Sequence, residues 1–174
     1  MNRKKTLVHS ALLCECQTLI NYFKLKQDKS CSAFKLYYNH QIVIIISGIG
    51  KENTINALSF VFEKFEISKA INIGIAGCKD KNIKIGTLFC TNQKFQDIPT
   101  TTLTTVDEPL NDINKLKTTL VDMEAFYFEE VCNKYCDNIL ILKVVSDYLD
   151  TNIPKKSFII KIIQESFTQW KSLL

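Results

Sequence analysis

The chain has 174 residues, of which 46% are hydrophobic and 23% are charged, a balance that is ordinary for a soluble globular protein. A chain of this length is expected to form one domain, residues 1–174, with a hydrophobic core of its own. The net charge of +4 is spread along the sequence, and the small basic clusters at residues 3–5 and 24–29 form no stripe that would bind nucleic acid.

Further features of the whole chain favour the cytoplasm. No apolar run reaches the roughly 18 residues expected of a membrane span, and Glu15 interrupts the N-terminal apolar stretch too early for a signal peptide. Seven cysteines at irregular spacing argue against a disulfide framework. Cys14 and Cys16 flank Glu15, but no second ligand pair with a recognisable spacing accompanies them, so we expect no metal. We therefore expect a cytoplasmic protein with free thiols and no membrane partner.

The first predicted strand covers residues 6–12, and a helix follows over about residues 15–25. Residues 33–38 and 41–47 predict a strand pair around a short turn at Asn39 and His40. Because Ile42 to Ile46 is continuously apolar, we expect both faces of that strand to be covered.

A glycine-containing loop, Ser47-Gly48-Ile49-Gly50-Lys51, joins this strand to a helix with Ile55, Leu58, Phe62 and Phe65 on one side. Glycines at such a junction let the backbone approach a ligand and direct N–H groups towards it. The spacing matches neither a P-loop nor a dinucleotide-binding fingerprint.

Residues 69–74 predict another buried strand, which residues 75–80 and then residues 83–89 follow. Residues 92–117 are polar and thinly patterned. Residues 119–123 predict a short strand, and a helical stripe begins at Ala125. Glu124 therefore lies where a strand passes into a helix, which is where ligands bind in open α/β sheets. A carboxylate there can also serve only to complement the helix dipole.

Residues 138–146 form the strongest parallel-strand pattern of the chain and end at Ser146 and Asp147. Pro154 opens a last helix, whose predicted inward stripe is Phe158, Ile159, Ile162, Ile163, Phe167 and Trp170. Strands that alternate with helices predict a three-layer α/β/α sandwich with a mixed, mainly parallel central sheet.

Four motifs resemble, in the same order, those of the nucleoside phosphorylase/nucleosidase superfamily: Ser47–Lys51, Ile71–Gly77, Val121–Ala125 and Ser146–Asp150. The run Val-Asp-Met-Glu-Ala is similar to the ribose-binding signature of its nucleosidases, and Ser-Asp-Tyr-Leu-Asp is similar to their Ser-Asp-x-x-Asp. The resemblance is strongest to methylthioadenosine/S-adenosylhomocysteine nucleosidases. The segment between Phe89 and Leu120 is much shorter here, and it keeps a Thr-Val-Asp-x-Pro element that is similar to that of shortened members.

The resemblance implies a role for each site residue. Asp147 would donate a proton or a hydrogen bond to the purine N7, and Glu15 would orient the attacking water. Glu124 would bind the ribose hydroxyls, with Met123 packing on the sugar. The substrate-binding set would be completed by Asp122, Ser146, Ala76, Gly77, Ser47 and Gly48. The resemblance calls for no metal and no organic cofactor.

The implied function is a purine nucleosidase that hydrolyses the N-glycosidic bond of an adenosine-type nucleoside, similar to methylthioadenosine or S-adenosylhomocysteine, to free base and sugar. The resemblance also implies a homo-oligomer, a dimer or larger. A phosphorylase that gathers phosphate with loop N–H groups and Lys51 or Lys143 is an alternative. Many phosphorylases carry a phosphate-binding arginine at the position of Asn72, and no arginine follows Arg3 here, which favours water.

A third alternative is a non-catalytic nucleoside-binding paralogue. Cys78, Thr87 and Lys143 replace the glycine, aspartate and arginine of the superfamily pattern. The lysine keeps the charge of an arginine but loses its bidentate fork.

Overall fold

The protein is described by a computed structural model that covers residues 4–110, 113–149 and 154–174. The strands are β1 (Lys5–Ser10), β2 (Lys26–Gln27), β3 (Lys35–Tyr38), β4 (Ile42–Ile46), β5 (Ile67–Cys78), β6 (Leu88–Cys90), β7 (Leu103–Thr105), β8 (Leu120–Asp122) and β9 (Ile139–Asp147). The helices are α1 (Leu13–Tyr22), α2 (Lys51–Lys64), α3 (Ala125–Cys132) and α4 (Lys156–Trp170), with short 3-10 turns η1 (Ile113–Lys115) and η2 (Lys171–Leu173).

The strands of the described chain join into one mixed sheet around β5. From one edge the order is β2, β3, β4, β1 and β5, and β9 pairs with the other side of β5 and then with β6. The central strands β4, β1, β5 and β9 run parallel, while β2, β3 and β6 pair antiparallel at the edges. Beyond the end of β1, the last residues of β5 pair with β8, which carries β7.

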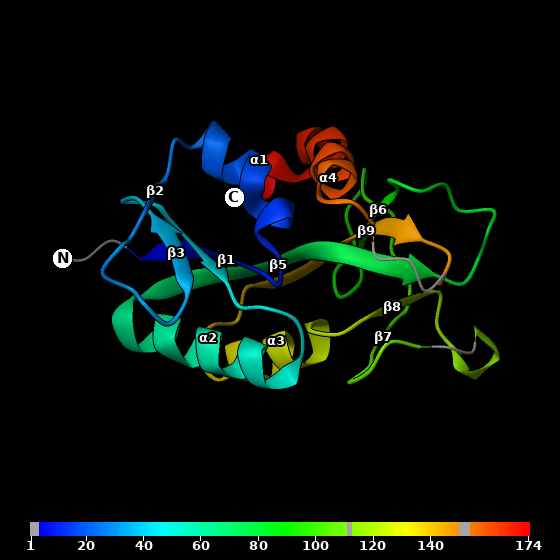
Figure 1. Ribbon diagram of the computed structural model, residues 1–174, viewed down its shortest axis with the longest axis horizontal. Helices are drawn as coiled ribbons and strands as arrows, with labels where there is room; N and C mark the ends of the chain where they lie inside the picture. The colour runs from blue at the N-terminus through cyan, green and yellow to red at the C-terminus, as the bar shows by residue number, and fades with distance from the viewer. Residues whose placement is uncertain (1–3, 111–112, 150–153) are drawn as a thin grey trace.

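Helices cover both faces of this sheet, as Figure 1 shows: α1 and α4 lie on one side, and α2 and α3 lie on the other. One apolar core, containing Leu19, Ile163 and Trp170, lies under α1 and α4. The other, containing Leu58 and Phe128, lies under α2 and α3. The predicted three-layer α/β/α sandwich with a mainly parallel centre is confirmed.

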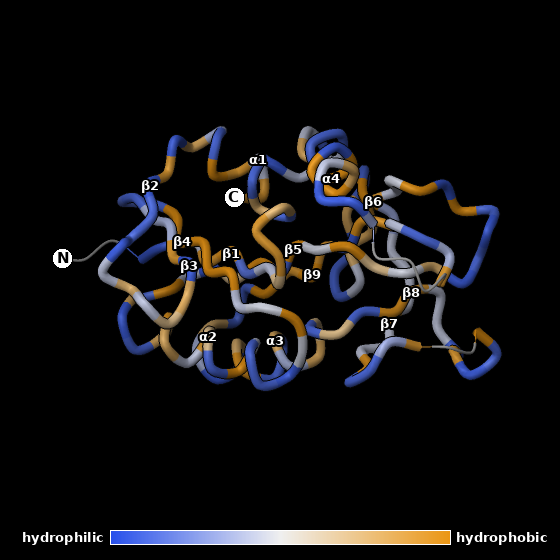
Figure 2. Tube along the Cα trace, viewed as in Figure 1, coloured by the Kyte–Doolittle hydropathy of each residue, from blue (hydrophilic) through white to orange (hydrophobic). Residues whose placement is uncertain are grey.

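The apolar patterns explain the layers. All five residues of β4 are buried, as expected of a strand covered on both faces, and Figure 2 shows β4 as a hydrophobic segment in the left half of the trace. On α4 the predicted stripe is buried at Ile159, Ile162, Ile163, Phe167 and Trp170, at the spacing of one helical face. Phe158 was predicted to face inward, but it is 36% exposed because it lies at the border of that face.

Two strand segments were not predicted. The residues after Gly74 form the second half of β5, which continues to Cys78 because β9 pairs with it through Gly77 and β8 pairs with Gly77 and Cys78. The thinly patterned segment contains β7, a half-buried strand of three residues that pairs with β8. Because two of its residues are the polar Thr104 and Thr105, it has no apolar pattern that would indicate a strand. Neither strand segment has the alternation that makes a strand visible in a sequence.

Within the described residues, no helix is both long and apolar enough to cross a membrane.

Candidate active site

The candidate site lies at one end of the central sheet, around the second half of β5. The segments that follow β1, β4, β8 and β9 all come to this end, as expected for a ligand site of an open α/β sheet. They bring Glu15, Glu124 and Asp147 to the same edge, from segments that are far apart in the sequence.

Glu15 is 3% exposed and lies in the first turn of α1. Its Oε2 accepts a hydrogen bond from the Leu12 N–H at 2.8 Å, and its Oε1 accepts one from the Ile75 N–H of β5 at 2.9 Å. Burial raises the pKa of Glu15 to about 7, although the two N–H groups and Lys143 act against this rise. Both oxygens are thus fixed, and the carboxyl group exchanges a proton near neutral pH.

Lys143 is the buried cation of the site. It lies on β9, is 1% exposed, and forms an ion pair with Asp122 at 2.7 Å from Nζ to Oδ2. A Cβ atom added to Gly74 would lie 3.0 Å from Glu15 Oε1 and 3.4 Å from Lys143 Nζ, so the ends of both side chains lie next to Gly74. Burial acts to lower the pKa of Lys143, but Asp122 and Glu124 raise it above its ordinary value, so the lysine stays charged.

Glu124 precedes α3 and is 8% exposed. Its Oε1 accepts a hydrogen bond from the Gly50 N–H at 2.9 Å, which joins the loop after β4 to the start of α3. Burial raises the pKa of Glu124, and the positive charge of Lys143 opposes that rise. Gly50 has φ of +93°, a conformation that favours glycine, so the sequence permits the turn that directs this N–H group at Glu124.

Asp122 lies at the end of β8 with both oxygens in use. Oδ1 accepts from the Thr105 hydroxyl at 2.6 Å, and Oδ2 accepts from the Ala125 N–H at 2.8 Å as well as from Lys143. Asp122 therefore fixes the first turn of α3, holds the cation of the site, and ties β7 to both. Met123, between Asp122 and Glu124, is half-buried.

Asp147 ends β9 and is half-buried. Its Oδ2 accepts from the Ser146 hydroxyl at 2.6 Å, and its Oδ1 accepts from the Leu149 N–H at 2.9 Å. The Ser146 hydroxyl also lies 3.3 Å from the Ala76 carbonyl oxygen, and Gly77 pairs with Asp147 across the sheet. A carboxylate offers about four acceptor positions, so two remain for a ligand.

The site therefore has two parts along β5. Glu15 lies over Gly74 and Asp147 lies beside Gly77, three residues further, which is a spacing of about 10 Å along a strand. Lys51, the possible anion-binding group of a phosphorylase, has its ammonium group 5.3 Å from the centroid of the Tyr127 ring. Asp150, the last residue of the Ser-Asp-x-x-Asp motif, lies outside the described residues.

The chain has counterparts among known proteins. A profile of the phosphorylase superfamily matches residues 10–111, more than half of the chain. The chain belongs to the phosphorylase superfamily.

Two curated relatives are nucleosidases. The chain is 33% identical to an aminodeoxyfutalosine nucleosidase of Campylobacter jejuni over 73 residues, which are 42% of this chain and 32% of that protein. It is 27% identical to a 5′-methylthioadenosine/S-adenosylhomocysteine nucleosidase of Buchnera aphidicola over 148 residues, which are 82% of this chain and 52% of that protein. The chain therefore spans about half the length of these curated relatives or less.

Among solved structures, the futalosine hydrolase of Helicobacter pylori superposes with a TM-score of 0.80 at 16% identity, covering 98% of this chain and 97% of that one. At this identity the similarity shows a shared fold.

One buried polar residue near the candidate site, His9, was not predicted from the sequence. His9 lies in the predicted first strand, is fully buried, and contacts Ser47 and Asn72 through its two ring nitrogens. A charged or polar residue in the middle of an apolar strand was the available signal, because a buried histidine requires partners.

Cys14 and Cys16, which raised the question of a metal site, belong to the core beneath α1. Burial raises the pKa of the Cys16 thiol to about 12, and this thiol donates to the Ser10 hydroxyl at 3.0 Å. All seven cysteines of the chain are free thiols.

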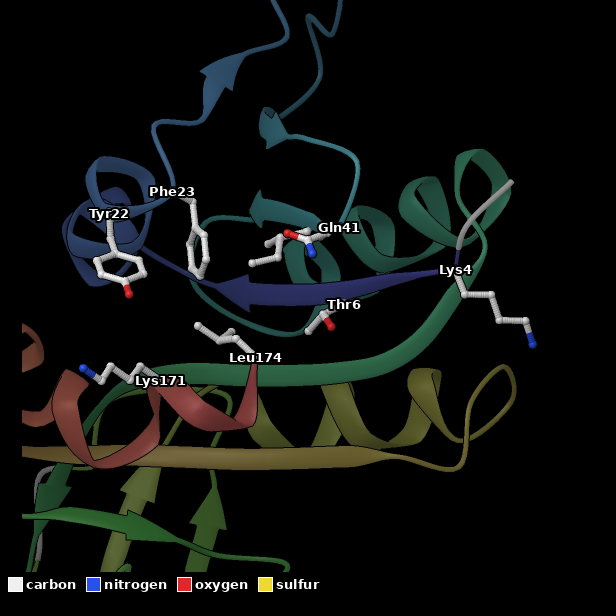
Figure 3. A pocket seen from close by; sticks show the side chains of 8 residues that line it. Lys4, Thr6, Tyr22, Phe23, Gln41, Lys171 and Leu174 are labelled. Atoms are coloured by element: carbon white, nitrogen blue, oxygen red, sulfur yellow. The ribbon is translucent and has the colours of Figure 1, made fainter. Parts of the chain in front are cut away.

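A cavity of about 360 Å³ lies at the opposite end of the sheet (Figure 3). It is lined by the amino ends of β1 and β4, at Thr6 and Ile42, together with Tyr22, Phe23 and Lys171. Because the carboxyl groups of the candidate site lie at the carboxyl ends of these strands, this cavity is separate from them.

Proposed function

We propose that this protein is a purine nucleosidase that hydrolyses the N-glycosidic bond of an adenosine-type nucleoside, of the methylthioadenosine or S-adenosylhomocysteine kind, to free base and sugar. The proposal rests above all on Glu15. A buried carboxyl group that is fixed by two backbone N–H groups, with a pKa near 7, has the geometry and the proton affinity of a general base.

In the proposed reaction the bond between C1′ and the purine nitrogen breaks as the sugar gains oxocarbenium character. Asp147 supplies a proton at N7, so that the base departs as a neutral molecule, or a hydrogen bond that stabilises the negative charge of the departing base. Glu15 orients a water molecule and accepts its proton as the water oxygen bonds to C1′. Glu124 binds the ribose hydroxyls by charge-assisted hydrogen bonds, and Met123 packs on the sugar.

The remaining substrate-binding residues would support these groups. Ser146 and Ala76 orient Asp147, and Gly77 leaves space beside it. Ser47 and Gly48 shape the loop whose Gly50 N–H group reaches Glu124. Asp122 holds Lys143 and the start of α3, so we assign it an indirect part in substrate binding.

The charges of the site favour water over phosphate as the nucleophile. A phosphate dianion needs a free cation or several N–H donors. Lys143 is already paired with Asp122, and the side-chain N–H group of Asn72 lies 2.9 Å from His9 Nδ1. The buried Oδ1 atom of Asn72 has no hydrogen-bond partner among the described residues, and it would repel an anion.

Compartment and assembly are part of the proposal. Seven free thiols, five of them in residues of the two main cores, are compatible with the reducing cytoplasm. We assign the protein to the cytoplasm as a homo-oligomer, a dimer or larger, that takes a small nucleoside and needs no cofactor.

The decisive experiment measures base release from a panel of purine nucleosides, with and without phosphate, by the wild-type protein and by Asp147→Asn. We expect phosphate-independent release, which falls by about 10²–10⁴-fold in Asp147→Asn because a general acid contributes about that much. Asp137→Asn is the matched control, since Asp137 is exposed and lies just before β9, at the other end of the same strand.

Three results would redirect the assignment. Release that requires phosphate and yields ribose 1-phosphate would make the protein a phosphorylase. Tight nucleoside binding without turnover would make it a binding paralogue. Equal turnover by wild-type protein and Asp147→Asn would remove Asp147 from the mechanism.

A further inference from the structure

His9 forms a polar chain beneath the candidate site that the proposed reaction does not use. The side chain is fully buried on β1. Its Nδ1 lies 2.9 Å from Asn72 Nδ2 on β5, and its Nε2 lies 2.9 Å from the Ser47 hydroxyl, just past the end of β4. The imidazole ring thus bridges the side chains of both neighbouring strands.

The direction of these hydrogen bonds follows from the donor groups. An amide nitrogen only donates, so His9 Nδ1 accepts from Asn72, and the ring proton is on Nε2, which donates to Ser47. The Ser47 hydroxyl then donates to the Gly48 carbonyl oxygen at 2.6 Å. Burial, followed by the charge of Lys143, lowers the pKa of His9 to about 3, so the ring is neutral at physiological pH.

This series of hydrogen bonds from His9 ends at the loop whose Gly50 N–H group binds Glu124. Gly48 and Gly50 have φ of +89° and +93°, and the Gly50 N–H group donates to Glu124 Oε1 at 2.9 Å. Fixing the Gly48 carbonyl oxygen fixes the orientation of its peptide plane, from which the chain turns to Gly50. Through Ser47 and Gly48, His9 therefore helps to position the Gly50 N–H group that donates to Glu124.

His9 also contacts α3, the helix that begins directly after Glu124. Its ring stacks on Phe128 of α3, with centroids 5.5 Å apart and planes inclined by 28°. The Phe128 N–H group donates to the Glu124 carbonyl oxygen at 2.9 Å, so Phe128 lies one turn after Glu124 on the same helix. One buried ring thus touches both the loop that donates to Glu124 and the helix that carries Glu124.

We propose that His9 is a positioning residue that holds the Gly50 N–H group against Glu124 and thereby sets the recognition of the ribose hydroxyls. The inference rests on the proposed function in one part, because it assigns the hydroxyls to Glu124. If His9 only filled the core, its substitution would weaken the binding of all parts of the substrate alike and would not act on the ribose hydroxyls in particular.

Two variants separate the hydrogen bonds of His9 from its packing. His9→Phe keeps an aromatic ring against Phe128 but removes both hydrogen bonds. His9→Gln offers a carbonyl oxygen to Asn72 and an N–H group to Ser47, so it should restore the chain. Ser47→Ala interrupts the same chain with a smaller change, and it serves if His9→Phe does not fold by circular dichroism.

The first measurement is hydrogen exchange at the Gly50 amide by NMR, which needs no ligand. We expect exchange that is about 10-fold faster in His9→Phe and Ser47→Ala, because the loss of one hydrogen bond changes an equilibrium by about that factor. In His9→Gln the exchange should be that of the wild-type protein. The second is kcat/KM for a cleaved nucleoside and its 3′-deoxy analogue. The preference for the ribonucleoside should fall by about 10-fold in the two chain-breaking variants, and it should return in His9→Gln.

Unchanged Gly50 exchange in folded His9→Phe would overturn the inference, and so would an equal loss for the two nucleosides. If the wild-type protein cleaves no nucleoside, the proposed function fails, whereas the Gly50 exchange still decides whether His9 holds the loop.

Discussion

Glu15 combines two requirements that oppose each other. As part of the fold, its carboxyl oxygens accept N–H groups from the start of α1 and from β5. As the proposed base, it must lose its proton inside the protein, where burial disfavours the charge and raises its pKa to about 7. Because the pKa is higher in the folded than in the unfolded state, folding stability falls as the pH rises from about 4.5 to 7, by about 3 kcal/mol.

The pH dependence of the reaction should show the ionisation of Glu15. For an adenosine-type substrate, kcat/KM should rise tenfold per pH unit below about pH 7 and level off above it, because only the ionised Glu15 accepts a proton from water. The profile is measured from pH 5 to 9 under conditions in which circular dichroism shows the folded protein.

Glu15→Gln should abolish turnover, whereas Glu63→Gln, an exposed residue of α2, should leave the profile unchanged. A profile that is flat from pH 5 to 8 would exclude Glu15 as the base.

At the scale of single elements, β5 is the strand whose glycines make room for the site. Gly74 is buried and has no unusual backbone conformation, so a glycine is needed there for the space that a side chain would fill and not for its backbone freedom. An alanine Cβ there would meet the far ends of Glu15 and Lys143 together.

Gly74→Ala should therefore reduce kcat more than it reduces stability. Displacing a catalytic group by about 1 Å can reduce a rate by about 100-fold, and both neighbours of the new methyl group are side-chain ends that can shift. The variant is compared by kcat and by its urea midpoint.

Gly86→Ala is the matched control for this prediction. Gly86 has φ of +90° and its nearest outside atom, in Ile162, would lie 3.9 Å from a new Cβ, so this substitution strains the backbone without touching the site. It should lower the unfolding free energy by about 1 kcal/mol and leave kcat unchanged. If Gly74→Ala behaves like Gly86→Ala, the positions of Glu15 and Lys143 next to Gly74 have no role in the reaction.

The same strand shows where sequence reasoning succeeds and fails. The apolar run at β4 and the stripe of α4 predicted their layers, because burial of whole faces leaves a periodic pattern. The second half of β5 was not predicted, because Gly74 and Gly77 are turn residues in most contexts, and only the pairing with β9 and β8 keeps them extended. β7 depends in the same way on β8.

The candidate site shows a similar division. Local motifs indicated Glu15, Glu124 and Asp147, since each stands next to a strand end. The contacts of Lys143 with Asp122, and of His9 with Ser47 and Asn72, join residues up to 63 positions apart, and no local pattern reports them. Which polar groups share one buried space is decided by the packing of the sheet.

At the scale of the whole molecule, one sheet separates two main apolar cores, and a third, smaller cluster lies around Cys78, Phe89 and Val145. The core under α1 and α4 contains Trp170, the single tryptophan of the chain, while the core under α2 and α3 contains Cys132. Both cores share the central strands, because successive residues of a strand point to opposite faces. We therefore propose that residues 1–174 fold as one domain, in which neither helix layer is stable without the other.

Unfolding should then be a single transition whichever face is observed. Trp170 fluorescence reports one core, and alkylation of Cys132, located by mass spectrometry, reports the other; both residues are fully buried in the folded state. In a urea titration the two midpoints should coincide, and both should coincide with the far-ultraviolet circular dichroism. Cys31 is partly exposed and should be alkylated before the transition, which provides an internal control for the reagent. Exposure of Cys132 at a lower urea concentration than the change in Trp170 would show that the α2 and α3 layer unfolds alone. In that case the loop and helix that hold Glu124 would belong to a less stable part of the molecule than Glu15 does.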